Sequence, residues 1–237
     1  MPVDTTYRST APEIMDDFAM EGEILRDALD KIASINQLLG GNKVTLEGIK
    51  SLINSKPKDK VIRITDIGCG NGDMLRTLAD YANKQGLHFI LKGIDANRYT
   101  INHAQSLSKN YPNITYSCSD IFDDFSKTEP CDIMLCTLTL HHFKDEEIID
   151  LLENFKRLAT MGIVINDLQR SAVAYYLFKA LCYVFRLNDM SREDGLVSIL
   201  RGFKRADLLN YSKQLKLKSS SIKWKWAFRY QWIIKTI

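Results

Sequence analysis

The feature that most constrains the fold of this chain is a regular alternation that begins at residue 61. Short apolar runs rich in β-branched residues are separated by segments with helical spacing at 73–84, 98–109 and 145–158; the runs are "VIRITDI", "HFILKGI", "ITYSCS", "DIMLCTL" and "GIVIND". Such runs predict strands, and strands that alternate with helices predict right-handed crossovers and a parallel sheet with both faces covered. The alternation therefore predicts an α/β fold with a doubly wound, mostly parallel sheet.

The flanking residues predict further elements. Apolar residues recur at three- and four-residue spacings in 21–39, Gly40-Gly41 provides a stop, and a weaker helical pattern follows before the polar linker "SKPKDK". Near the C-terminus, two strand-like runs within "LKLKSSSIKWKWAFRYQWIIKTI" are close enough to pair antiparallel at the sheet edge, which makes seven strands. We expect an N-terminal helical cap over 1–58 and a domain over 59–237, with a helical insertion at about 171–203.

Composition and charge argue against several classes of function. The net charge of +3 comes from 32 basic and 29 acidic residues mixed along the chain, which does not point to a polyanionic partner. The five cysteines are odd in number and lack CxxC spacing, which argues against a disulfide framework and a zinc knuckle. The start has no apolar segment behind a basic one, so we expect no secretory signal and a cytoplasmic location.

The longest apolar stretch is "SAVAYYLFKALCYVF" at 171–185. It contains a lysine and is shorter than the ~20 residues that a transmembrane helix needs, so we predict no transmembrane segment. A core helix is the simplest interpretation. The wall of an apolar substrate pocket and a contact with a membrane surface are the alternatives.

A glycine-rich turn follows the first predicted strand in "ITDIGCGNGD". Gly68, Gly70 and Gly72 would allow a tight turn and a close approach of the backbone to a ligand at a helix N-terminus. A dinucleotide fingerprint expects its third glycine where Asp73 stands, and this carboxylate would repel a pyrophosphate. Asp66 is equally unfavourable for an anion. Two carboxylates that flank an amide-rich turn instead suit a zwitterion, such as the methionine part of S-adenosylmethionine.

The next two predicted strands also end in acids. Asp95, followed by Ala96 in "LKGIDAN", could accept hydrogen bonds from a ribose diol. Asp120, in "SCSDIF", could accept one from an adenine amino group while Ile121 and Phe122 pack on the ring. Taken singly, each acid could also be a solvated loop carboxylate or a helix cap.

Together these residues resemble the signature of class I S-adenosylmethionine-dependent methyltransferases. The signature is Asp66-x-Gly68-x-Gly70-x-Gly72, then Asp95 and Asp120 at the ends of successive strands, within roughly residues 60–168. The resemblance implies a Rossmann-like methyltransferase fold and S-adenosylmethionine as the cofactor, with S-adenosylhomocysteine as its product. The residues expected around that cofactor are Asp66, Gly68, Cys69, Gly70, Asp95, Ala96, Asp120, Ile121, Cys136 and Thr137.

Two adjacent histidines follow the fourth predicted strand in "DIMLCTLTLHHF". Ligands of open parallel sheets bind over the carboxyl ends of the strands, so Cys136 and Thr137 would border the cofactor and His141 or His142 would lie near its methyl group. A histidine could take a phenol or enol proton, because it titrates near neutral pH. The alternative is a hydrogen-bonded structural histidine.

We predict no metal site at this pair. Metal-binding histidines need helical i, i+4 spacing or ligands from several segments, whereas neighbours at a strand end point in different directions. The sequence contains only two other histidines, His88 and His103. Asn166 and Asp167 end the fifth strand and are predicted to lie on the same rim, near the substrate.

Nucleic acid is not an expected partner. "TLTLHHF" lacks the Asn/Asp-Pro-Pro-aromatic motif typical of nucleic-acid N-methylating enzymes. Methylation of cytosine at C5 would need a cysteine nucleophile, but Cys131 begins the fourth strand and so lies at the wrong end of the sheet. The run "KWKWAFRYQW" could bind single strands through its aromatic and basic residues. Its strict alternation more simply predicts a strand with Trp224 and Trp226 inward and Arg229 outward.

A narrower resemblance concerns the flanks. "YRSTAPEIMDD", "LRDALDKIASINQLLGG" and "SREDGLVSILRGF" are similar to segments of bacterial quinone-biosynthesis-like methyltransferases that accompany type III polyketide synthases, whose products are alkylated phenols. The resemblance implies that residues 12–18 close over the cofactor and that Asp194, Ser198 and Arg201 face the substrate. The sequence departs from that pattern at Glu193 and Leu196, where the family has His and Pro.

The sequence thus predicts methyl transfer to a small, apolar phenolic, quinol or polyketide-like acceptor. The alternatives are an NAD-dependent Rossmann oxidoreductase and a non-catalytic S-adenosylmethionine-binding protein. We expect a small-molecule substrate, and a homodimer is compatible with the sequence.

Overall fold

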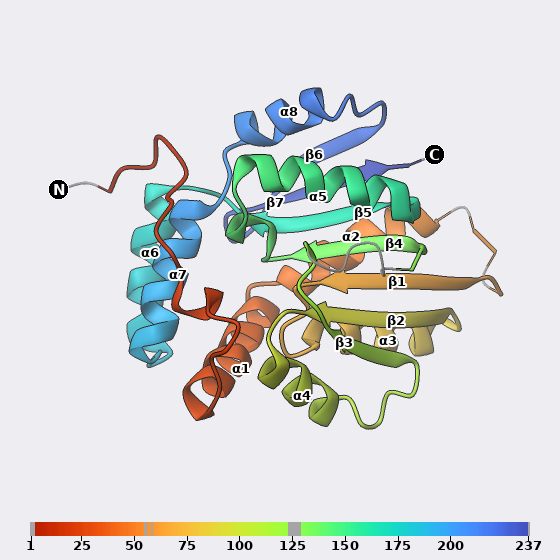
Figure 1. Cartoon of the computed structure of the whole chain (residues 1–237), viewed down its shortest axis with the longest axis horizontal. Helices are drawn as coiled ribbons and strands as arrows, with labels where there is room; N and C mark the ends of the chain where they lie inside the picture. Colours follow the sequence, from red (N-terminus) through yellow and green to blue (C-terminus); the bar gives the residue numbers. More distant parts are fainter. Residues whose placement is uncertain (1–2, 55, 58, 123–128, 237) are drawn as a thin grey trace.

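The computed structural model describes residues 3–54, 56–57, 59–122 and 129–236. Its centre is a seven-stranded sheet with the strand order β3-β2-β1-β4-β5-β7-β6 (Figure 1). The strands are β1 Val61–Ile67, β2 His88–Asp95, β3 Ile114–Cys118, β4 Cys131–Thr137, β5 Ala159–Leu168, β6 Ser220–Lys225 and β7 Arg229–Lys235. The first five strands are parallel, and β7 runs antiparallel to both β5 and β6. The predicted sheet and its antiparallel C-terminal pair are confirmed.

Helices cover both faces of this sheet. The helices are η1 Ile14–Asp16, α1 Glu23–Leu38, α2 Gly41–Ile53, α3 Asp73–Gln85, α4 Arg98–Leu107, η3 Leu140–His142, α5 Asp145–Leu158, α6 Ala172–Val184, α7 Asp189–Arg201 and α8 Arg205–Gln214. One core cluster joins α5 and α8 to the sheet, and a second joins α2, α3 and α4 to its other face. In α5, Ile148, Leu151, Leu152 and Phe155 are fully buried at helical spacing, so one face of the helix packs on the strands.

Helix α2 packs directly against the sheet. Gly48 lies so close to Val164 of β5 that a Cβ atom would overlap the valine side chain, and Ile49 and Leu52 belong to the same core cluster as Val164. Part of segment 1–58 therefore contributes to the core of the sheet. The predicted domain boundary near residue 58 stays a prediction.

The remaining helices gather at one end of the sheet. The N-terminal segment, α1, α6 and α7 lie beyond the ends of β1 and β4, at the left of Figure 1. Helix α7 contacts α6, α1, η1 and η3. The N-terminal segment, α1, α6 and α7 together cover the carboxyl ends of the parallel strands. Among the described residues, no helix has the length and apolar character to span a bilayer.

The prediction of one continuous strand in "KWKWAFRYQW" is wrong. Strand β6 ends at Lys225, and the chain turns through residues 226–228, where Ala227 and Phe228 have left-handed backbone angles. Trp224 and Trp226 are 51% and 70% exposed, whereas Arg229 is only 3% exposed. The chain reverses inside the run, so the alternation does not continue through it.

Candidate active site

A cavity of about 1500 Å³ lies over the carboxyl ends of the parallel strands. The glycine-rich turn and the ends of β2 and β3 line one part of it, the glycine end. The two histidines, the N-terminal segment, α6 and α7 line the other, the histidine end. Its volume exceeds the ~300–1000 Å³ of a typical small-molecule pocket, so it has room for two ligands.

The glycine-rich turn brings backbone to the cavity without side chains. Gly68 and Gly70 have left-handed backbone angles, with φ of 67° and 52°. A Cβ on Gly68 would overlap Thr139, whereas a Cβ on Gly70 would meet only Leu29, at 3.9 Å. The turn is fixed to β2, because the Gly70 N–H donates to Asp95 Oδ2 at 3.0 Å. Gly70 is therefore the position where the turn borders open space.

Buried acids give the glycine end an affinity for positive charge. Asp66 is 2% exposed, and its Oδ1 has no hydrogen-bond partner within the described part of the chain. Burial, together with the charges of Asp95 and Asp73, raises the pKa of Asp66 to about 7. Burial also raises the pKa of Asp95, although the N–H groups of Asn97 and Gly70 donate to its carboxylate. A cationic group placed here would stabilise both carboxylates.

Most of the predicted cofactor residues line this cavity, namely Asp66, Gly68, Cys69, Gly70, Asp95, Ala96, Asp120, Ile121 and Thr137. Cys136 does not. It is fully buried in the core cluster beneath α5, because neighbouring residues of a strand point to opposite faces. Asp73 has a structural part as well, since it accepts hydrogen bonds from Asn42, at 2.6 Å, and from Gln37. It thereby joins α3 to α2 and α1.

The two histidines lie in a short helix beyond β4. The strand ends at Thr137, and Leu138, with φ of 54°, turns the chain into η3. Both imidazole rings then lie side by side, with their centroids 4.4 Å apart and a tilt of 32°. The prediction that His141 and His142 point in different directions is therefore wrong. It assumed that the strand continues to the histidines, and a left-handed leucine is rare enough that no sequence pattern indicated the turn.

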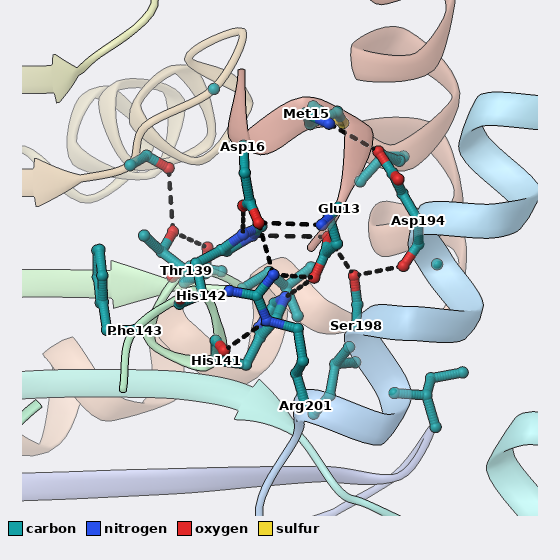
Figure 2. A pocket seen from close by; sticks show the side chains of 18 of the residues that line it. Glu13, Met15, Asp16, Thr139, His141, His142, Phe143, Asp194, Ser198 and Arg201 are labelled. Carbon is teal, nitrogen blue, oxygen red and sulfur yellow. Dashed lines mark hydrogen bonds and ion pairs between the residues drawn. The ribbon is translucent and has the colours of Figure 1, made fainter. Parts of the chain in front are cut away.

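Each histidine is held by a carboxylate at Nδ1, and Figure 2 shows His142 beside its partner Asp16. His141 Nδ1 lies 2.7 Å from Asp167 Oδ1, and His142 Nδ1 lies 2.7 Å from Asp16 Oδ1. Because a carboxylate only accepts, each Nδ1 carries the hydrogen, and the Nε2 of the neutral ring presents a lone pair. The Nε2 atoms of His141 and His142 face the carboxylate of Glu13, at 3.7 Å from Oε1 and 3.9 Å from Oε2 respectively.

The carboxyl groups of Glu13, Asp16 and Asp167, which contact the two imidazoles, differ in their pKa. Burial raises the pKa of Glu13, and the nearby cations only partly offset this effect. Burial also acts to raise the pKa of Asp16 and Asp167. For Asp16 it is outweighed by hydrogen bonds from His142, the Glu13 N–H and Arg201, and for Asp167 by His141 and the Leu168 N–H, so both pKa values lie below the ordinary range. Asp16 and Asp167 are thus ionised partners of the imidazoles.

Helix α7 holds the N-terminal segment in place. Ser198 Oγ donates to Glu13 Oε2 at 2.7 Å, and Arg201 Nη1 donates to Asp16 Oδ2 at 2.6 Å. The carboxylate of Asp194 accepts from two backbone N–H groups of η1, at 2.6 and 3.0 Å. The predicted substrate residues Asp194, Ser198 and Arg201 do line the cavity, but these polar groups bind the segment that carries Glu13.

Two arginines fix the backbone of η3. Arg8 Nη2 donates to the carbonyl oxygens of His141 and Phe143 at 3.0 and 2.9 Å. Arg201 donates to the carbonyl oxygens of His141, at 3.2 Å, and His142. The orientation of both imidazoles therefore depends on residues from the N-terminal segment and from α7.

The other two predicted substrate residues lie behind the cavity wall. Asn166 is fully buried, and its Nδ2 donates to the Gly41 carbonyl and to Thr45 Oγ1, both at 3.0 Å. Asp167 is 1% exposed and reaches the cavity only through His141. Neither lines the cavity. Asn166 anchors α2 to the sheet, and Asp167 positions an imidazole.

Sequence reasoning missed Glu13, Asp16 and Arg8. All three lie in the quoted segment "YRSTAPEIMDD", where charged residues stand in a stretch without helical or strand periodicity. The resemblance of this segment implied that residues 12–18 close over the cofactor, but it gave no role to these three side chains.

Helix α6 forms an apolar wall. Ala174, Leu177, Phe178 and Leu181 follow the i, i+3, i+4, i+7 spacing of one helix face and line the cavity. Of the helix residues, only Ala174 and Cys182 are buried, so the simplest interpretation, a core helix, is wrong. The pocket-wall alternative agrees with the structure.

Comparisons with known proteins identify a methyltransferase domain and the fold. Residues 64–162, from β1 into β5, match the family model described as a methyltransferase domain. No curated protein matches the sequence. The match confirms the predicted methyltransferase domain over these residues.

Several solved structures share the fold. The plantazolicin methyltransferase BpumL in complex with SAH is 18% identical, with a TM-score of 0.65, over 87% of this chain and 88% of that one. Magnesium protoporphyrin IX methyltransferase (ChlM) from Synechocystis PCC 6803 with bound SAH is 16% identical, with a TM-score of 0.55, over 93% and 91%. The CurJ carbon methyltransferase is 14% identical, with a TM-score of 0.60, over 81% and 54%. At these identities the likeness concerns the fold, and the narrower resemblance to quinone-biosynthesis enzymes stays a prediction.

Proposed function

We propose that this methyltransferase transfers the methyl group of S-adenosylmethionine to a small, apolar acceptor that carries a hydroxyl group, of phenolic, quinol or polyketide-like type. The observation that carries the proposal is that one cavity joins the glycine-rich turn to the histidine pair. The solved structures that share the fold include methyltransferases with bound SAH and SAM. Their acceptors differ, so the acceptor proposed for this chain rests on its own cavity.

The glycine end suits S-adenosylmethionine on charge and space. Asp66, with an unpartnered buried oxygen, would bind the ammonium group, and Gly68 and Gly70 leave room for the methionine part beside the backbone. Each Asp95 oxygen accepts one backbone hydrogen bond and keeps a second lone pair for the ribose diol. Asp120 and Ile121 border the place of the adenine.

The histidine end suits a polar group on an otherwise apolar acceptor. The face of α6 that lines the cavity is apolar, and Phe143 and Phe122 pack edge to face, 5.1 Å apart, nearby. Against this wall, the Nε2 atom of His142, whose side chain is partly exposed, would accept the hydrogen bond of an acceptor hydroxyl and so orient or deprotonate it, while the buried imidazole of His141 lies beside it. In the transfer, the S–CH₃ bond breaks as the O–CH₃ bond forms, and sulfur keeps the electron pair. Positioning of the two reactants supplies much of such a rate enhancement.

Calorimetry tests the cofactor part of the proposal. S-adenosylmethionine and S-adenosylhomocysteine are expected to bind the purified protein, and Asp95→Ala is expected to abolish this binding. Tight binding of NAD without a response to S-adenosylmethionine would overturn the proposal. A methyl-transfer assay with alkylphenols and quinols then separates an enzyme from a binding protein, since the latter shows no turnover on any acceptor. A cytoplasmic location and a homodimer remain predictions from the sequence.

A further inference from the structure

We infer that Glu13, His141 and His142 form a binding site for one divalent transition-metal cation of the zinc type. One ligand atom from each residue lies within 4.8 Å of the other two. The inference rests on the proposed function and deepens it, because such a cation would bind the hydroxyl oxygen of the acceptor. It also revises the expectation of no metal, which took the histidines as the only ligands and assumed that they point apart.

The first support is the state of the two imidazoles. Both use Nδ1 to donate to a carboxylate, Asp167 for His141 and Asp16 for His142, at 2.7 Å in each case. This leaves both Nε2 lone pairs directed at the same carboxylate (Figure 2). A metal-binding histidine almost always donates its other ring hydrogen to a carboxylate, carbonyl or water, which fixes the tautomer. Here two adjacent histidines share that arrangement.

The second support is a pair of buried atoms without partners. Glu13 Oε1 and His141 Nε2 are both inaccessible to solvent and have no hydrogen-bond partner among the described residues. They lie 3.7 Å apart, which is too long for a hydrogen bond. Two ligands at about 2.0–2.1 Å from a tetrahedral Zn²⁺ lie roughly 3.3 Å apart. A shift of a few tenths of an ångström, about the size of a side-chain adjustment, would therefore let a cation bridge them.

The third support is the charge around the cluster. Glu13, Asp16 and Asp167 place three carboxyl groups beside the two imidazoles. Arg201 lies 3.6 Å from Glu13 Oε1 but donates to Asp16 at 2.6 Å, and Arg229 interacts with Asp167 through its charge. The three carboxyl groups outnumber the two guanidinium groups, which leaves an excess of acidic groups. A bound cation would compensate it in this water-poor part of the cavity.

The ligand set indicates the class of metal. Two imidazole nitrogens and one carboxylate form a set that Zn²⁺ uses in catalytic sites, where a fourth position stays open. Mg²⁺ prefers oxygen ligands and binds such a set weakly. All three ligand residues line the cavity, so an open position on the cation would face the acceptor. Coordination of a hydroxyl oxygen to a metal ion lowers its pKa, which would favour the oxygen as a nucleophile.

Metal binding can be measured without any turnover. The protein is freed of metal with a chelator and titrated with ZnSO₄ by calorimetry, then with CoCl₂ while the visible absorption of Co²⁺ is recorded. We expect one Zn²⁺ per chain, a visible Co²⁺ spectrum typical of low coordination number, and no comparable response to MgCl₂. Glu13→Gln should weaken Zn²⁺ binding by at least about 100-fold, and Asp16→Asn by about 10- to 100-fold. His88→Ala removes an exposed histidine far from the cluster and should change nothing.

Different results would refute the metal site and the proposed function. If the chelated protein fails to bind Zn²⁺, or if Glu13→Gln binds it as tightly as the unchanged chain, the metal site is refuted. Retained S-adenosylhomocysteine binding shows that Glu13→Gln is folded. Should that variant not fold, His142→Ala, whose side chain is partly exposed, replaces it with the same expected loss. Absence of S-adenosylhomocysteine binding in the unchanged protein would instead refute the proposed function.

Discussion

The two ends of the cavity are assembled in different ways. At the glycine end, the predicted cofactor residues that line the cavity lie in the last residues of a parallel strand or just after it, and the backbone of the turn is fixed to β2 by the Gly70–Asp95 hydrogen bond. At the histidine end, four segments distant in the chain meet: the N-terminal segment, η3, the end of β5 and α7. The glycine end is thus part of the sheet, whereas the histidine end depends on contacts between loops and helices. Changes at one end should therefore leave the other intact.

The largest expected effect is a loss of turnover at the histidine end. His141→Ala removes the imidazole that faces Glu13, and kcat should fall by about 100-fold or more, the usual size of a lost proton-transfer or metal-binding group. Affinity for S-adenosylhomocysteine should stay within about twofold, because the glycine end is separate. Steady-state kinetics and calorimetry on the same preparation check both values. A parallel loss of S-adenosylhomocysteine binding would contradict the separation of the two ends.

Two glycine-to-alanine variants test the glycine end of the cavity. Gly70→Ala adds a methyl group where the turn borders open cavity, and S-adenosylhomocysteine affinity should fall at least about tenfold, or about 1.4 kcal/mol. Gly86→Ala is the matched control. It also has a positive φ, of 64°, and an added Cβ there meets nothing within 4 Å. Both variants should lose a similar roughly 1–2 kcal/mol of stability in denaturant unfolding, since both place alanine in the left-handed region. Equal affinities would show that the ligand lies elsewhere.

A smaller effect is expected from loosening the N-terminal segment. Asp194→Asn weakens the two hydrogen bonds that η1 donates, so Glu13 should be less well positioned. Acceptor turnover should fall by about tenfold, in proportion to the roughly 1–2 kcal/mol that such charged hydrogen bonds contribute. Asp189→Asn changes an exposed acid on the same helix and serves as the control. The segment would have no catalytic importance if both variants turned over acceptor at the same rate.

The smallest effect is a pH dependence of the glycine end. Asp66 has a pKa of about 7 in the free protein, and a cationic ligand binds its ionised form. S-adenosylmethionine affinity should therefore rise about threefold from about pH 6.5 to about pH 7.5. Because folding raises the pKa of this carboxyl, its contribution to the free energy of unfolding falls as pH rises between its unfolded pKa and about 7. Asp66→Asn should remove both dependences, and persistence of either in that variant would assign it to another group.

The glycine end and the sheet could be predicted from the sequence because their signals are local. Strand periodicity located β1 to β5, and the acids that end those strands follow from where each strand ends. The histidine end could not be predicted in this way. Glu13 reaches the site through contacts with α7, and Leu138 in a left-handed conformation turns both imidazoles to one side. Neither the contacts that position Glu13 nor the left-handed conformation of Leu138 produces a periodic pattern in the sequence.

The most direct test of a single cavity with a cofactor end and an acceptor end is a crystal structure of the protein with S-adenosylhomocysteine. The account predicts that the ligand lies along the glycine-rich turn, with its ribose on Asp95 and its sulfur facing the cluster of Glu13, His141 and His142. A ligand bound outside this cavity, or one whose sulfur faces away from the histidines, would contradict it.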